Sequence, residues 1–185
     1  MKSNAALLLL AGIFGTGLFL TSCKKDSDKT ETTKTLYDSL GGSTMVNDPA
    51  NSGTMIQQGR LGIRSVLDST IFVIAADTAI NGFFQTLLAE VTAGNTSGFE
   101  ALSKKLTDFV CVGTGSTSYT YGGKSMTAAH DPAQNSRMNG KAANDDFDAF
   151  VADLVIGAKK NGLSDQLIGR VGALVETLRT QVVQK

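Results

Sequence analysis

The chain is poor in residues that break helices or form cross-links. Its 185 residues include two Pro, two Cys, one His and no Trp. With so few prolines, several long stretches lack the commonest helix breaker, which favours an all-α fold. Two cysteines allow at most one disulfide, and none if one of them is modified. Because His130 is the only histidine, a metal centre bound through imidazole would have to use it.

The chain also lacks an excess of charge of either sign. It has 17 basic and 17 acidic side chains, and no basic run is interleaved with aromatic residues. A neutral chain exerts no long-range attraction on nucleic acid, so we expect no nucleic-acid partner. The hydrophobic content of 42% and the length are those of one globular domain with a substantial core.

The N-terminus has the pattern of an export signal. Lys2 supplies a positive start, residues 5–20 are almost all apolar or small, and polar residues follow Cys23 at once. The ending Leu20-Thr-Ser-Cys23 resembles the bacterial lipobox, whose cysteine is lipidated. We therefore predict a lipoprotein signal peptide at 1–22 and a lipid on Cys23. An uncleaved anchor, or a simple secretory signal with an incidental Cys23, is the alternative.

Residues 23–34 continue as a charged and hydroxylic segment with no apolar side chain to bury after the cysteine. This composition predicts a solvated tether, followed by the folded domain at 35–185. The predicted location is the bacterial cell envelope, outside the cytoplasm, with the lipid holding the protein on a membrane. Cys111 then has no disulfide partner and is predicted to be a small core residue.

Apolar residues recur at helical spacing through the rest of the chain, and none of it alternates as a strand would. The stripe Ile63, Val66, Leu67, Ile71 and Ile74 is typical of one buried helix face. Turn formers predict surface loops at 43–59 and 131–143 and a corner at 79–84. Helices are predicted at about 36–40, 60–76, 99–112, from an Asn144 N-cap to Gly162, and from Ser164 onward.

The only histidine lies four residues after Met126, just beyond the glycines at 122 and 123. Imidazole is the commonest metal ligand among side chains and holds haem iron in many proteins. A single histidine is also often a plain surface or helix-end residue. Taken alone, therefore, His130 does not decide between the two interpretations.

Four segments in a fixed order resemble the truncated haemoglobins, group I. They are Leu36-Tyr-Asp-Ser-Leu-Gly-Gly42, Ile80-Asn-Gly-Phe-Phe84, Tyr121-Gly-Gly-Lys-Ser-Met126 followed by His130, and Asp146-Phe-Asp148 at the start of a long helix. The likeness runs from Leu36 to the C-terminus. It implies an all-α, two-over-two helical sandwich that encloses haem b.

The resemblance also implies roles for individual residues. His130 would be the proximal ligand of the iron, Phe84 would pack on the porphyrin, and Lys105 would meet a haem propionate. The pocket would be lined further by Met126, Phe109, Phe147, Phe150 and Leu154. By the same resemblance, the bound ligand would be a diatomic gas such as O₂, NO or CO.

The sequence departs from the family on the side where the gas would bind. Where the family often has a tyrosine and a glutamine, both of which bond to bound O₂, this chain has Ile71 or its neighbour Phe72, and Leu106. Leu102 adds another apolar group there. We therefore expect O₂ to be held weakly relative to CO. Nitric-oxide oxidation is implied by resemblance only. The alternatives are a haem-free envelope interaction module and a haem carrier or sensor.

Overall fold

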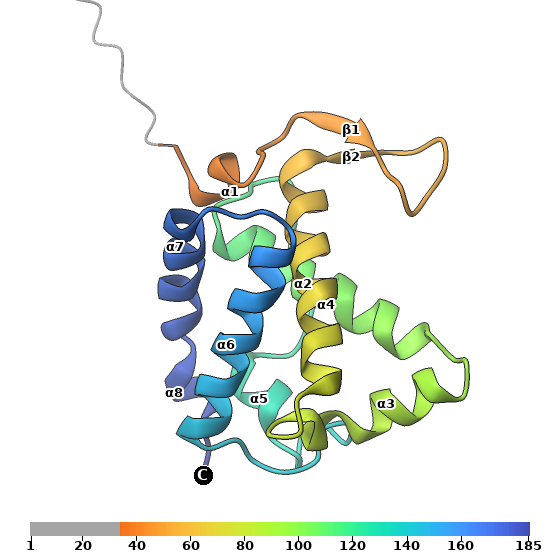
Figure 1. Cartoon of the computed structure of the whole chain (residues 1–185), viewed down its shortest axis with the longest axis vertical. Helices are drawn as coiled ribbons and strands as arrows, with labels where there is room; N and C mark the ends of the chain where they lie inside the picture. Colours follow the sequence, from red (N-terminus) through yellow and green to blue (C-terminus); the bar gives the residue numbers. More distant parts are fainter. Residues whose placement is uncertain (1–33) are drawn as a thin grey trace, which may run out of the picture. The chain divides into compact units, whose positions relative to one another are not determined.

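The computed structural model describes residues 34–185, so the predicted signal peptide, Cys23 and most of the tether lie outside the described residues. Helices dominate this part of the chain, which confirms the all-α prediction (Figure 1). The helices are α1 (Leu36–Ser39), α2 (Gln58–Ala76), α3 (Gln85–Thr92), α4 (Ser97–Gly113), α5 (Met126–His130), α6 (Asn144–Lys160), α7 (Asp165–Glu176) and α8 (Arg179–Val182). A 3-10 turn, η1 (Asn81–Phe84), and the strands β1 (Met45–Asn47) and β2 (Met55–Gln57) complete the described elements.

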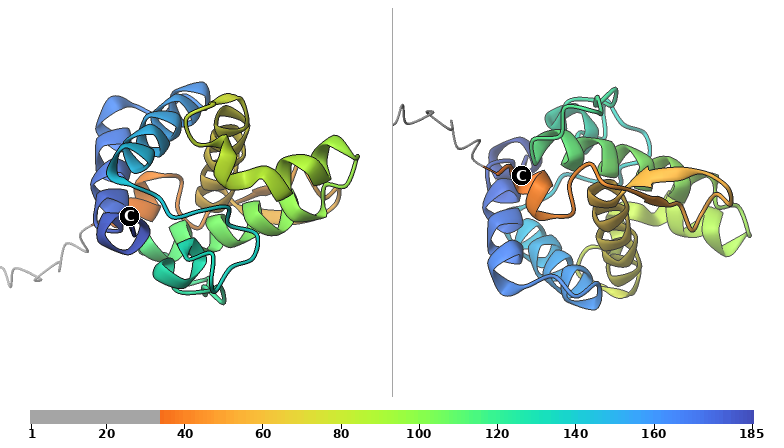
Figure 2. Two further views of the ribbon diagram at one scale, coloured as in Figure 1. Left: turned by 90° about the horizontal axis from the view of Figure 1, so that it is seen from below. Right: turned by 90° about the horizontal axis from the view of Figure 1, so that it is seen from above.

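Helix α2 lies at the centre of the helical packing. It packs against α6 on one side and α4 on the other, and α7 covers α6 (Figures 1 and 2). Gly157 of α6 permits a close crossing, because a Cβ at this position would lie only 2.9 Å from the backbone nitrogen of Thr70 in α2. The two helices therefore pack almost backbone to backbone at this point.

The predicted stripe of α2 is buried at all five positions, Ile63, Val66, Leu67, Ile71 and Ile74. Each such side chain contributes roughly 1.5–3 kcal/mol when it leaves water. Because α2 is covered by α4 and by α6, this burial ties both sides of the domain to one helix. No single helix among residues 34–185 is long and apolar enough to cross a membrane, and only the bent pair α2 and η1–α3 passes that test together.

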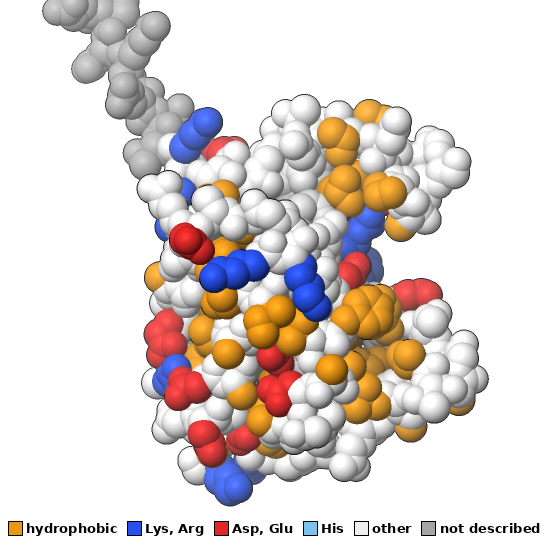
Figure 3. All heavy atoms as spheres, viewed as in Figure 1, with side chains coloured by type: hydrophobic (Ala, Val, Ile, Leu, Met, Phe, Trp, Pro, Cys, Tyr) orange, Lys and Arg blue, Asp and Glu red, His pale blue; other side chains and the backbone are white. Residues whose placement is uncertain are grey.

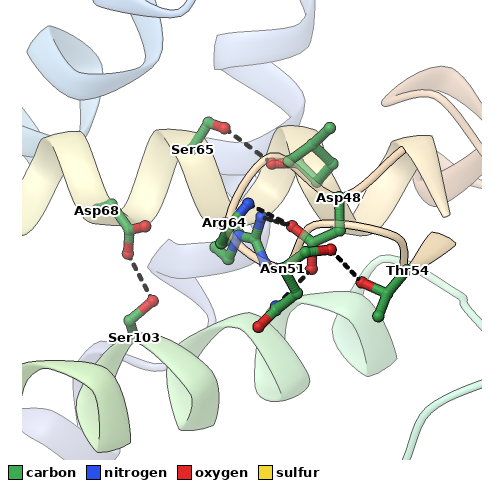
Figure 4. A network of polar contacts seen from close by, with 9 residues as sticks. Asp48, Asn51, Thr54, Arg64, Ser65, Asp68 and Ser103 are labelled. Carbon is green, nitrogen blue, oxygen red and sulfur yellow. Dashed lines mark hydrogen bonds and ion pairs between the residues drawn. The ribbon is translucent and has the colours of Figure 1, made fainter. Parts of the chain in front are cut away.

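The prediction that residues 43–59 form an irregular loop is wrong in part. β1 and β2 pair as an antiparallel hairpin in which Val46 lies opposite Ile56. Each strand has three residues, which is too short for an alternating pattern to be recognised. Arg64 of α2 holds the hairpin loop through Asp48, with Nη2–Oδ1 at 2.6 Å (Figure 4).

Two helix predictions need correction, and helices α3 and α5 were not predicted. The helix predicted from Ser164 is two helices, α7 and α8, since the chain turns at Thr177, whose hydroxyl donates to the Leu174 carbonyl at 2.6 Å. The N-cap of α6 is Ala143 rather than Asn144, and the Asp146 carboxylate accepts a hydrogen bond from the Ala143 amide. Helix α3 was not predicted, because its eight residues are too few for a clear helical pattern.

Candidate functional site

A largely apolar cavity of about 640 Å³ lies among α2, α4, α5 and α6. This volume is within the range of small-molecule and cofactor pockets, roughly 300–1,000 Å³. All of the pocket residues predicted from the sequence line it: Phe84, Leu102, Lys105, Leu106, Phe109, Met126, His130, Phe147, Phe150 and Leu154. These residues come from four separate elements, η1, α4, α5 and α6, so the fold brings together what the sequence keeps apart.

The one histidine ends the short helix α5. Ser125 caps the start of that helix by accepting a hydrogen bond from the Ala128 amide at 3.2 Å. His130 Nδ1 lies 2.8 Å from the carbonyl oxygen of Met126. Since a carbonyl only accepts hydrogen bonds, Nδ1 must carry the proton, and Nε2 keeps its lone pair. Burial lowers the pKa of His130, which favours the neutral, metal-binding form of the ring.

Neighbouring groups fix the position of α5. The Tyr121 hydroxyl donates to the Lys124 carbonyl at 2.8 Å, and its ring meets Phe109 edge-on at 5.1 Å. Gly123 leaves room for this ring, because a Cβ there would collide with it. Near the C-terminus, the side-chain amide of Gln184 donates from Nε2 to the Thr127 carbonyl at 2.8 Å. The family resemblance had implied no role for Tyr121 or Gln184.

Aromatic and aliphatic side chains form the walls of the cavity. Phe147 is only 2% exposed, and its ring lies 6.2 Å from that of Phe150. Phe84 ends η1 and also faces the cavity, as does Leu154 of α6. Such walls exclude water and suit a flat apolar ligand.

The structure decides between Ile71 and Phe72. Ile71 is buried and lines the cavity, whereas Phe72 is 63% exposed and packs on Phe99 at 5.4 Å. Thr70, which also lines the cavity, donates its hydroxyl to the Val66 carbonyl at 2.8 Å. The side chains of Ile71 and Leu106 in the cavity wall are therefore apolar, and the hydroxyl of Thr70 is already engaged within α2.

Cationic side chains occur at the edge of the cavity. Lys105 and Lys124 line it, as does Arg137, which the sequence had not singled out. Lys104, next to Lys105, instead pairs with Asp108 at 2.7 Å. On the face shown in Figure 3, acidic and basic side chains are interspersed. Lys105 and Lys124 can meet the carboxylates of a ligand at this edge of the cavity.

A second polar cluster lies outside the cavity. Arg60 pairs with Asp108 at 2.7 Å and stacks over the Tyr119 ring at 4.4 Å. Beside them Cys111 is fully buried, and burial raises the pKa of its thiol to about 11. A thiol that stays protonated and out of contact with water is unreactive, which confirms Cys111 as a core residue.

Helices packed around an apolar cavity, with one half-buried histidine at the end of a short helix, define a globin-like fold. The solved structures agree. The truncated hemoglobin of Tetrahymena pyriformis in its Fe(III) form matches with a TM-score of 0.59 and 22% identity, over 82% of this chain and 100% of that one. The 2/2 hemoglobin of Synechococcus sp. PCC 7002, in the cyanomet state with covalently attached heme, matches with a TM-score of 0.58, the same identity and the same coverage. No family model and no curated protein matches the chain.

Proposed function

We propose that this protein binds haem b in the cavity through His130 and binds a diatomic gas on the opposite face of the haem. The observation that carries the proposal is the position of His130 on an apolar cavity, with Nδ1 engaged by Met126 and Nε2 left with its lone pair. Haem would supply the iron that binds the gas. A histidine with Nδ1 hydrogen-bonded and Nε2 free can hold that iron.

The residues around the cavity fit a haem group. Phe84 and Phe147 offer apolar surface to a flat macrocycle, and Leu154 extends it. Lys105 and Lys124 provide cations for two carboxylates, while the walls keep water from the bound group. The likeness to solved truncated hemoglobins supports the same assignment, and we place the protein with group I on the sequence resemblance.

The apolar wall also supports a preference among gases. Ile71, Leu102 and Leu106 line the cavity and offer no hydrogen-bond donor to a bound gas. A hydrogen-bond donor in this wall would stabilise O₂ more than CO, because O₂ would be the better acceptor of the two. We therefore propose that CO is held firmly and O₂ weakly.

We also propose that the protein is an envelope lipoprotein outside the cytoplasm. The support is the apolar run at 5–20, the sequence Leu20-Thr-Ser-Cys23 at its end, and the polar segment that follows. Each methylene of an acyl chain buried in lipid contributes ~0.8 kcal/mol to membrane attachment. A Cys23→Ala variant should leave the membrane fraction or remain unprocessed. If wild type and variant have the same processed size and fractionate alike, Cys23 is not lipidated.

The absorption spectrum of the purified protein tests the haem proposal. We expect a Soret band, its strong reduction in His130→Ala, and partial recovery when imidazole is added to fill the space left by the side chain. Lys104→Ala is the matched control, because Lys104 pairs with Asp108 rather than lining the cavity. A colourless protein that cannot be reconstituted with haemin would refute haem binding and favour a haem-free interaction module. Rapid transfer of haem to an apo-acceptor would indicate a carrier.

A further inference from the structure

The loop of residues 131–143 lies along the cavity between the end of α5 and the start of α6. It begins directly after His130, and four of its residues line the cavity: Asn135, Arg137, Met138 and Ala142. We call residues 131–143 the strap. Its length exceeds what a simple connection between two helices needs, and connections of this length in compact domains are usually functional.

The strap is attached to both sides of the cavity. On the histidine side, Asn135 Nδ2 donates to the Ala129 carbonyl of α5 at 2.6 Å. On the other side, the Asn139 amide donates to the carbonyl of Phe83 in η1 at 3.3 Å. The strap therefore spans from the helix that carries His130 to the turn that carries Phe84.

An ion pair fastens the middle of the strap to α3. Arg137 donates from Nη1 to Glu90 Oε1 at 2.8 Å and from Nη2 to Oε2 at 2.6 Å. This two-bond geometry is the strongest that arginine makes with a carboxylate. The hydrogen bonds from Arg137 also lower the pKa of Glu90. Helix α4 leaves room for the pair at Gly98, where a Cβ would lie against both charged groups.

We propose that the Arg137–Glu90 ion pair is a latch that holds the strap across the cavity and sets how fast haem enters and leaves. This inference rests on the proposed haem-binding function. Haem that leaves between α5 and η1 must displace the strap, and the polar contacts of Asn135 with α5 and of Asn139 with η1 are single hydrogen bonds. Opening the latch therefore requires breaking one bidentate ion pair. Because Arg137 is half exposed, water can replace the lost contacts, and the pair can break at ordinary temperatures.

Charge reversal tests the latch. In the full chain we compare Arg137→Glu, Glu90→Arg and the double swap. In haem-free protein, the exchange rate of the Asn139 amide should rise in each single variant and return towards wild type in the swap. In haem-loaded protein, transfer of haemin to an apo-acceptor should accelerate roughly 2- to 5-fold in the single variants and slow again in the swap, as expected for the loss and restoration of a partly exposed pair.

Two further variants separate the latch from general effects. Gly98→Ala leaves both charges in place but pushes them apart, so it should accelerate transfer as the single reversals do. Arg64→Ala breaks a bidentate pair with Asp48 at the hairpin, as Figure 4 shows, and should change neither rate.

The outcomes distinguish the inference from the function on which it rests. Faster amide exchange with unchanged haemin transfer would refute the strap as the route of haem exit. Unchanged exchange in both single variants would refute the latch. A wild-type chain that never takes up haemin would refute the proposed function itself, and the strap's part in haem exit with it.

Discussion

Replacing Leu106 with glutamine should strengthen O₂ binding. Leu106 of α4 and Ile71 of α2 both line the cavity. Thr70, next to Ile71 in the chain, donates its hydroxyl to the Val66 carbonyl. The wild-type wall therefore offers O₂ no free donor at this place. A glutamine amide at position 106 would supply one.

The size of the effect follows from the energy of one hydrogen bond. A hydrogen bond to a charged partner contributes about 1.5–3 kcal/mol. Since ~1.36 kcal/mol is a tenfold change in rate, O₂ should dissociate roughly 10- to 150-fold more slowly from Leu106→Gln. In the gas-free site the new amide lies against apolar side chains without a partner. The same variant should therefore lose about 1–3 kcal/mol of its free energy of unfolding.

Stopped-flow displacement of O₂ by excess CO measures the dissociation rate directly. Leu106→Met is the control, because it keeps an apolar side chain of similar volume and should leave the rate within a few-fold of wild type. The rate of CO dissociation should change little in either variant. No slowing of O₂ release, or an equal slowing for CO, would show that a missing donor at position 106 does not govern O₂ binding.

Three further comparisons use urea denaturation of the haem-free protein. Burial lowers the pKa of His130 below its ordinary 6.5, so His130 in the unfolded chain takes up a proton at a higher pH than in the folded chain. The free energy of unfolding should therefore fall as the pH drops below 6.5. His130→Gln should remove this part of the pH dependence. Phe147→Ala should cost ~3–5 kcal/mol, but Phe72→Ala, at an exposed position, less than ~1. Gly157→Ala should destabilise by ~1–3 kcal/mol by crowding α2, whereas Gly169→Ala, which faces open space in α7, should stabilise by ~0.5–1. Equal effects within either pair would contradict the packing described.

The sequence predicted best what depends on local spacing. The five apolar residues of α2 repeat with the helical period, so their common burial was visible before the structure. His130 and Met126 are four apart, which is the spacing at which a helix brings a side chain near a carbonyl of the preceding turn. By contrast, spacing alone could not choose between Ile71 and Phe72. Adjacent residues on a helix differ by about 100° in direction, so only the packing shows which one faces the cavity.

Short elements and long-range contacts could not be predicted from the sequence. The hairpin strands have three residues each, and α3 has eight, so neither provides enough repeats for a period to be read. Gly157 shows the same limit for packing. Its place opposite Thr70 follows from the crossing of α2 and α6, which depends on residues 87 positions apart along the chain.

The two segments predicted as long surface loops have one physical feature in common. Each is tied to a helix by an arginine and a carboxylate: Asp48 to Arg64, and Arg137 to Glu90. The partners are 16 and 47 residues apart, so no local pattern reveals them. In a chain with equal numbers of acidic and basic side chains, such pairs can order polar segments without adding to the hydrophobic core. At the strap, a segment that lines the cavity is thus held by a contact that salt and acid weaken, while the apolar walls around His130 remain unaffected.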